Sequence, residues 1–206
     1  GRIRNLGFSF HGDVEVFDYL LSKQDEWKWD FVQIQMNYLD WSMQDAKAKY
    51  ALLKERGIPV WVMEPVRGGK LADLGETNNA KLAAFRPDAS PASFAFRWLQ
   101  GKENIRMILS GMSNMAQLKE NMAVFDDFKP LSEKEAAAVG EAAEAFNDMV
   151  EIKCTACRYC TEGCPMNIAI PEHFANYNAA KLYGYVPSMS NYFTSLCDKS
   201  GAPSAW

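Results

Sequence analysis

The chain has 206 residues, a formal net charge of −4 and 48% hydrophobic residues, which is ordinary for a soluble globular protein with one medium domain and one small domain. It has no basic run or stripe, so nucleic acid is excluded as an expected partner. No apolar run reaches the ~18 residues that span a membrane, and no signal peptide is visible, so we expect no membrane contact and a cytoplasmic location.

Strand and helix signals alternate along most of the chain. Short apolar runs predict four strands, at residues 6–10, 30–38, 58–63 and 105–109. Helix signals between and after these runs predict helical segments at residues 14–21, 42–56, 80–85, 90–99, 114–122 and 132–149. Helix starts are expected at Asp13, Ser42 with Asp45, Ser90 with Pro91, Asn114, and Ser132 with Glu135. Repeated strand-then-helix units predict a parallel sheet with right-handed crossovers.

The pattern changes near Val150. Beyond it, cysteines, prolines and turn residues replace the periodic segments, which predicts two domains, residues 1–150 and residues 151–206. The chain opens at Gly1 without a methionine and closes at Trp206 without a clear stop. We therefore expect the sequence to be part of something longer, with an incomplete second domain.

Four of the five cysteines lie close together and are followed by a proline. Cys154, Cys157, Cys160 and Cys164, with Pro165, have the spacing C-x2-C-x2-C-x3-C-P. Iron–sulfur clusters prefer thiolate ligands, and two-residue gaps let one tight loop wrap several thiolates around a single cube. This is the bacterial ferredoxin spacing, so it predicts a 4Fe-4S cluster.

A structural zinc site is the competing interpretation. Zinc sites usually use two separated C-x2-C pairs, whereas only Cys197 lies outside this motif. The fourth cluster ligand stays open between Cys164, Cys197 and a cysteine beyond the sequence, although Cys197 is most simply a small hydrophobic residue. Residues 168–174 resemble the strand and short helix that follow the motif in ferredoxin domains, with His173 at the surface.

Four segments of the first domain resemble, in order, the last four strands of the aldo/keto reductases. Residues 7–12 (GFSFHG) are similar to the fifth strand, and residues 33–38 (QIQMNY) to the sixth, which starts from a glutamine. Residues 63–69 (MEPVRGG) resemble the seventh-strand segment and its glycine-rich loop. Residues 110–114 (SGMSN) and 117–121 (QLKEN) resemble the eighth-strand cofactor loop and the helix after it.

With the cysteine motif, the chain resembles the aldo/keto reductases that are fused to a C-terminal ferredoxin domain. The resemblance implies an α/β fold, the C-terminal half of a TIM (β/α)8 barrel with strands five to eight, followed by a small ferredoxin-like α+β domain. The family's catalytic Asp, Tyr, Lys and His lie on the first four strands, so none is assigned here. A half-barrel has open strand edges, so we expect poor solubility, a homodimer, or completion by further sequence.

The resemblance also implies a nicotinamide cofactor at the C-terminal mouth of the barrel. Ser9 and Gln33 would contact the carboxamide, and Met63 would cover the nicotinamide ring. The pyrophosphate would meet Arg67, Gly68 and Gly69, and the adenine would meet Glu120 and Asn121. Met112, in the cofactor loop, and His11, which could equally close a strand end, complete the candidate cofactor residues.

Two positions bear on the choice of cofactor. Gly111 and Gln117 stand where the family has a Lys and an Arg that grip the 2′-phosphate of NADPH. Without these cations a 2′-phosphate loses its charge-assisted contacts, so NADH is favoured within NAD(P)H.

The implied activity is hydride transfer between a nicotinamide and a small-molecule carbonyl substrate. The cluster would pass single electrons to or from a redox protein partner. The alternative is a non-enzymatic electron-transfer or cluster-binding module that uses the barrel half as a scaffold. Titration with nicotinamide cofactor would separate the two interpretations.

Overall fold

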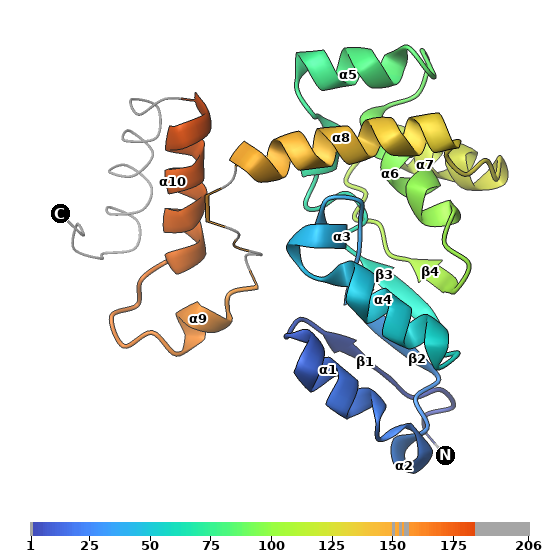
Figure 1. The fold of residues 1–206 in the computed structure, drawn as a ribbon, viewed down its shortest axis with the longest axis vertical. Helices are drawn as coiled ribbons and strands as arrows, with labels where there is room; N and C mark the ends of the chain where they lie inside the picture. The colour runs from blue at the N-terminus through green and yellow to red at the C-terminus, as the bar shows by residue number, and fades with distance from the viewer. Residues whose placement is uncertain (1, 150, 153, 155–156, 184–206) are drawn as a thin grey trace. The chain divides into compact units, whose positions relative to one another are not determined.

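The structure is a computed structural model that describes residues 2–149, 151–152, 154 and 157–183. Contacts divide the chain into two compact units, Gly1–Glu144 and Ala145–Trp206 (Figure 1). None of the helices described here combines the length and apolar character needed to cross a bilayer.

A four-stranded parallel sheet forms the centre of the first unit. Its strands are β1 (Gly7–Phe10), β2 (Phe31–Gln35), β3 (Val60–Met63) and β4 (Ile105–Ile108), in the spatial order β1-β2-β3-β4. The expected parallel sheet of four strands is therefore confirmed, with strand order following chain order as it does in a barrel segment.

Helices connect and follow these strands. In chain order they are α1 (Val14–Leu21), α2 (Gln24–Trp27), α3 (Asp40–Met43), α4 (Ala46–Glu55), η1 (Lys70–Ala72), α5 (Glu76–Ala83), α6 (Pro91–Gln100), α7 (Met115–Asp126), α8 (Glu133–Met149), α9 (Tyr159–Glu162) and α10 (Ile170–Tyr183). Three expected N-caps are confirmed, because Asp13, Ser90 and Asn114 each accept a hydrogen bond from a backbone N–H in the first turn of the helix that follows.

The segment after β2 differs from the prediction. The expected strand over residues 30–38 ends at Gln35, because the side chain of Asn37 accepts the N–H groups of Leu39 and Asp40 and turns the chain. The helix expected over residues 42–56 is found as α4, but its expected start at Ser42 is wrong. A separate short helix, α3, precedes α4, and the two are separated where Asp45 adopts a left-handed φ of 51°.

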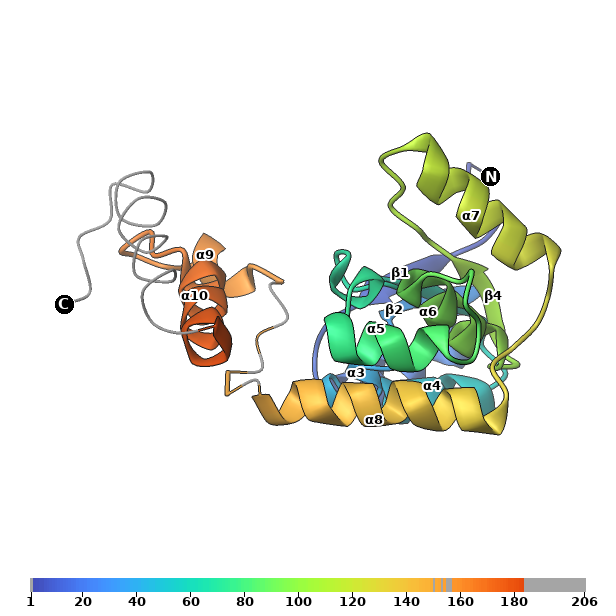
Figure 2. The same cartoon turned by 90° about the horizontal axis from the view of Figure 1, so that it is seen from above.

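The two faces of the sheet differ in character. Val32, Ile34, Val60 and Val62 form a core with side chains of α1, α4 and α6. Figure 2 shows helix α4 beside the strands. The alternating positions point the other way. They carry Phe31 and Trp61, whose rings stack with centroids 3.8 Å apart, and the polar or sulfur-bearing residues Ser9, Gln33 and Met63.

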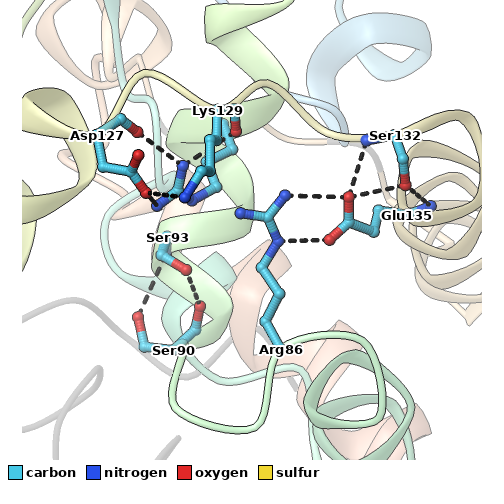
Figure 3. A network of polar contacts seen from close by, with 8 residues as sticks. Arg86, Ser90, Ser93, Asp127, Lys129, Ser132 and Glu135 are labelled. Carbon is cyan, nitrogen blue, oxygen red and sulfur yellow. Dashed lines mark hydrogen bonds and ion pairs between the residues drawn. The ribbon is translucent and has the colours of Figure 1, made fainter.

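An ion pair fixes the start of α8 (Figure 3). The carboxylate of Glu135 accepts hydrogen bonds from the Arg86 guanidinium, which follows α5, and from the N–H and hydroxyl of Ser132. Glu135 also donates its N–H to the Ser132 hydroxyl, so the expected capping box is confirmed. The hydrogen bonds from Arg86 are the largest cause that lowers the pKa of Glu135, from 4.5 to about 2.

We expect this lowered pKa to make folding stability depend on pH. A carboxylate with a lower pKa in the folded state stabilises the fold above pH ~4.5, and that contribution is lost as the pH falls toward 2. In urea unfolding between pH 7 and pH 3, Glu135→Gln should remove part of the acid-dependent loss of unfolding free energy. The exposed neighbour Glu133 provides the control Glu133→Gln, and equal effects of the two variants would contradict the prediction.

Candidate functional site

A pocket of about 660 Å³ lies at the carboxyl ends of β3 and β4. The segment after β3, the segment after β4 and the first turns of α6 and α7 line it. Its wall includes Met63, Glu64, Pro65, Val66, Gly68, Gly69, Ala72, Ser90, Ala92, Phe96, Leu109, Ser110, Gly111, Met112, Ser113, Gln117, Glu120 and Asn121. The carboxyl ends of parallel strands are where barrel enzymes place their sites.

The pocket brings together most of the residues singled out from the sequence. Eight of the twelve candidate cofactor residues line it, namely Met63, Gly68, Gly69, Gly111, Met112, Gln117, Glu120 and Asn121. The other four, Ser9, His11, Gln33 and Arg67, are not among the lining residues.

Three of the candidate nicotinamide residues lie next to one another on the sheet. Ser9 is the register partner of Gln33 on the neighbouring strand, and the Gln33 side-chain amide lies 3.6 Å from the sulfur of Met63. This row leads from the open face of the sheet to the pocket, where Met63 is part of the wall. His11 follows the carboxyl end of β1 and is exposed.

The turn after β3 has an unusual backbone. Glu64, Arg67, Gly68 and Gly69 have φ values of 56°, 48°, 60° and 87°. For residues with a side chain this left-handed region costs roughly 1–2 kcal/mol each, so Glu64 and Arg67 need other contacts to hold them there. Among the described residues, the N–H groups of Gly68 and Gly69 donate no hydrogen bond to the protein. Successive N–H groups in such a turn form a concavity that suits an anion.

The side chain of Arg67 forms an ion pair that was not predicted for it. Its side chain is 9% exposed, and its Nε lies 3.1 Å from a carboxylate oxygen of Asp40, which is fully buried. Asp40 also accepts hydrogen bonds from Gln35 at 2.8 Å, from Asn37 at 2.7 Å and from Gln44 at 3.3 Å. The arginine expected at the pyrophosphate therefore forms a buried ion pair with Asp40.

Asn37 joins this network to the strand beside it. Its amide nitrogen donates to Asp40 and, at 2.8 Å, to the carbonyl oxygen of Glu64, while its oxygen accepts the N–H groups of Leu39 and Asp40. All four hydrogen-bonding positions of the amide are used. The end of β2 is thus tied to the left-handed residue that follows β3.

The segment after β4 forms the other wall of the pocket. Gln117 accepts the N–H of Ser113 at 2.8 Å, and the Asn121 amide donates to the hydroxyl of Ser110 at 3.0 Å. The pocket wall contains two carboxylates, Glu64 and Glu120, and no Lys or Arg among its described residues. The described wall residues therefore offer no cationic side chain to a phosphate group.

The cysteine segment belongs to the second unit. Cys157 and Cys160 are exposed, whereas Cys154 and Cys164 are half-buried, and the sulfur of Cys164 accepts the N–H of Ile168 at 3.4 Å. Within the part of the chain that the structure describes, no group of three or more His, Cys, Asp or Glu side chains is gathered around a metal position. Cys197 lies outside the described residues. Four thiols are nevertheless the donor set that a cluster requires.

Helix α10 contacts this segment at three points. The Asn178 amide pairs with both the N–H and the carbonyl of Ile152, at 3.0 and 2.8 Å. Glu172 pairs with Arg158, and the Tyr177 hydroxyl donates to Glu151 (all three contacts lie within the second unit). The strand expected near residue 168 is not found, because α10 begins at Ile170, where Pro171 suits the first turn of a helix. His173 lies in this helix and is half-buried.

Two residues of the first site were not predicted from the sequence. Asp40 follows the buried apolar pair Tyr38-Leu39, and a carboxylate at such a position could have signalled a buried partner. Glu64 lies between the last residue of β3 and Pro65. The residue before a proline has a restricted backbone, and Glu64 begins the next turn in the left-handed region. Neither signal identifies the partner side chain.

Comparison with known proteins assigns the first unit to a family. Residues 1–144 match the aldo/keto reductase family, and the chain therefore belongs to that family. Among solved structures it is similar to the aldo-keto reductase AKR11C1 from Bacillus halodurans in its holo form, with 20% identity and a TM-score of 0.48 over 62% of this chain and 46% of that chain. The chain thus spans less than half the length of that relative. No curated protein matches it.

Replacing Asn37 should destabilise the fold strongly. Asn37→Ala leaves buried Asp40 short of a donor and releases the turn after β2, which should lower the unfolding free energy by about 2–3 kcal/mol in urea titration. Asn78→Ala is the control, because that amide makes a single hydrogen bond, to the carbonyl of Leu74. Losses of the same size for both variants would contradict the role given to Asn37.

Proposed function

We propose that the chain supplies the nicotinamide-dinucleotide half of an oxidoreductase of the aldo/keto reductase type, which acts on a small-molecule carbonyl. The observation that carries this proposal is the pocket at the carboxyl ends of β3 and β4. The N–H groups of two glycines in its wall donate to no other residue that the structure describes. Family membership of residues 1–144 supports the same proposal.

Each end of the pocket suits one part of the cofactor. The N–H groups of Gly68 and Gly69 would bind the pyrophosphate, and the side chains of Glu120 and Asn121 would meet the adenine. Ser9 and Gln33 would orient the carboxamide, with Met63 against the ring and His11 near the mouth. When bound, the nicotinamide supplies the hydride. Arg67 is not assigned a phosphate contact, because its Nε pairs with buried Asp40 and its side chain is not among those that line the pocket.

NADH is the proposed form of the cofactor. The wall formed by Gly111, Met112 and Gln117 offers no cation to a 2′-phosphate, and Glu120 would repel one. Gln117 already uses its oxygen to accept from Ser113. An adenosine ribose with two free hydroxyl groups avoids this penalty.

We expect NADH to bind the 206-residue chain in a fluorescence titration, with NADPH binding more weakly. Gln117→Arg would add a cation to the wall and should shift the ratio of NADPH to NADH affinity by roughly tenfold toward NADPH. Met122→Arg introduces the same charge on an exposed part of the same helix and should leave the ratio unchanged. Failure of the unmodified chain to bind either dinucleotide would overturn the proposal.

A second candidate function rests on the cysteine segment. Cys154, Cys157, Cys160 and Cys164 have the donor chemistry of a 4Fe-4S cluster, and α10 holds the segment on both sides of Cys154. We propose that this ferredoxin-type unit passes single electrons between the barrel part and a redox protein partner in a reducing compartment such as the cytoplasm. If the barrel part binds no dinucleotide, the same unit would serve as a non-enzymatic electron-transfer module.

Metal analysis of anaerobically reconstituted protein tests the cluster directly. About four iron and four acid-labile sulfide per chain are expected, and Cys160→Ser should remove most of both. Cys197→Ser, outside the motif, should retain them and would leave Cys164 as the fourth ligand. Zinc without sulfide would replace the cluster with a structural zinc site.

A further inference from the structure

The buried ion pair of Asp40 and Arg67 adjoins the glycine turn of the pocket, because Arg67 directly precedes Gly68. Arg67 precedes Gly68 in the chain, so any movement of its backbone moves both glycines. Its guanidinium is the cationic partner of Asp40 in this network, and the Asp40 carboxylate is fully buried at the end of β2. Two separate segments, the one after β2 and the one after β3, therefore meet through this ion pair and through the hydrogen bond from Asn37 to the carbonyl of Glu64.

The backbone of Arg67 is held in a conformation that its side chain alone would not favour. Its φ is 48°, and the left-handed run continues through Gly68 and Gly69. Its N–H donates to the carbonyl of Glu64 at 3.1 Å, whose own position is fixed by the amide of Asn37. The side chain of Asn37 also contacts Asp40, so the backbone and the guanidinium of Arg67 are both fixed by the same network.

We propose that Asp40 is a positioning residue for dinucleotide binding, which holds the Gly68–Gly69 turn in its pyrophosphate-binding shape by anchoring the side chain of the adjacent Arg67. Asp40 is not among the residues that line the pocket, so its effect on binding would pass through Arg67. This inference rests on the proposed function, and it assigns Arg67 to support of the turn rather than to the phosphate. It also predicts that only the part of the ligand at the turn depends on Asp40.

Comparison of two ligands isolates that dependence. NADH reaches both the glycine turn and the adenine end of the pocket, whereas adenosine would use only the end near Glu120 and Asn121. Asp40→Asn keeps the size of the side chain but leaves the buried Arg67 cation without its counter-charge. We expect NADH affinity to fall about tenfold and adenosine affinity to stay within about twofold, both measured by calorimetric titration of the full chain.

The matched control is Asp45→Asn, which removes an exposed carboxylate five positions further along the same segment and should leave both affinities unchanged. If Asp40→Asn does not fold, Arg67→Lys provides a second test. It keeps the buried positive charge but loses the planar donor group, and it should cause the same selective loss of NADH affinity.

The outcomes separate the two levels of the proposal. If the unmodified chain binds NADH and Asp40→Asn binds it equally well, the positioning role is overturned while the proposed function stands. Equal losses of NADH and adenosine affinity would also overturn it, since they indicate general destabilisation. If the unmodified chain binds no NADH, the proposed function fails and the positioning role fails with it.

Discussion

The first unit is organised around one carboxylate that has no access to water. A buried charge is tolerated only when a counter-charge and several hydrogen-bond donors surround it. Asp40 obtains one cation and three amide donors, and they come from β2, from the turn after it, from the end of α3 and from the turn after β3. Meeting that requirement fixes how the ends of β2 and β3 lie beside each other, and the turn after β3 forms part of the pocket wall.

The alternation of side chains along the strands separates the core positions of this sheet from its candidate cofactor positions. Valine and isoleucine at every second position build the core against α1, α4 and α6. The positions between them carry Ser9, Gln33 and Met63 on the opposite face, which would serve no purpose in a core. Substitutions at the candidate cofactor positions therefore leave the core positions of the sheet unchanged.

Local signals in the sequence predicted the features that depend on neighbouring residues. The caps at Asp13, Ser90 and Asn114 and the capping box of Ser132 and Glu135 follow from contacts three residues apart, and all are confirmed. The parallel order of the strands followed from regular alternation with helices. Eight candidate cofactor residues converge on one pocket because the family motifs that marked them follow the strand ends.

Features that depend on distant residues could not be read in the same way. Nothing in the sequence around Arg67 distinguishes a phosphate ligand from the partner of Asp40, 27 positions away, because both roles suit an arginine beside two glycines. The separation of α3 from α4 likewise depends on the packing around Asn37 and Asp40, which overrides helix propensity.

The double use of Glu135 has a consequence for how this chain can vary. One carboxylate caps α8 through Ser132 and also binds Arg86, so positions 86 and 132 share an acceptor. Once Glu135 is lost, a substitution at position 86 or 132 lowers the unfolding free energy little further. The effects of substitutions at Glu135 and at either of its partners are therefore not additive. In an evolving sequence, substitutions at these three positions would therefore be coupled to one another.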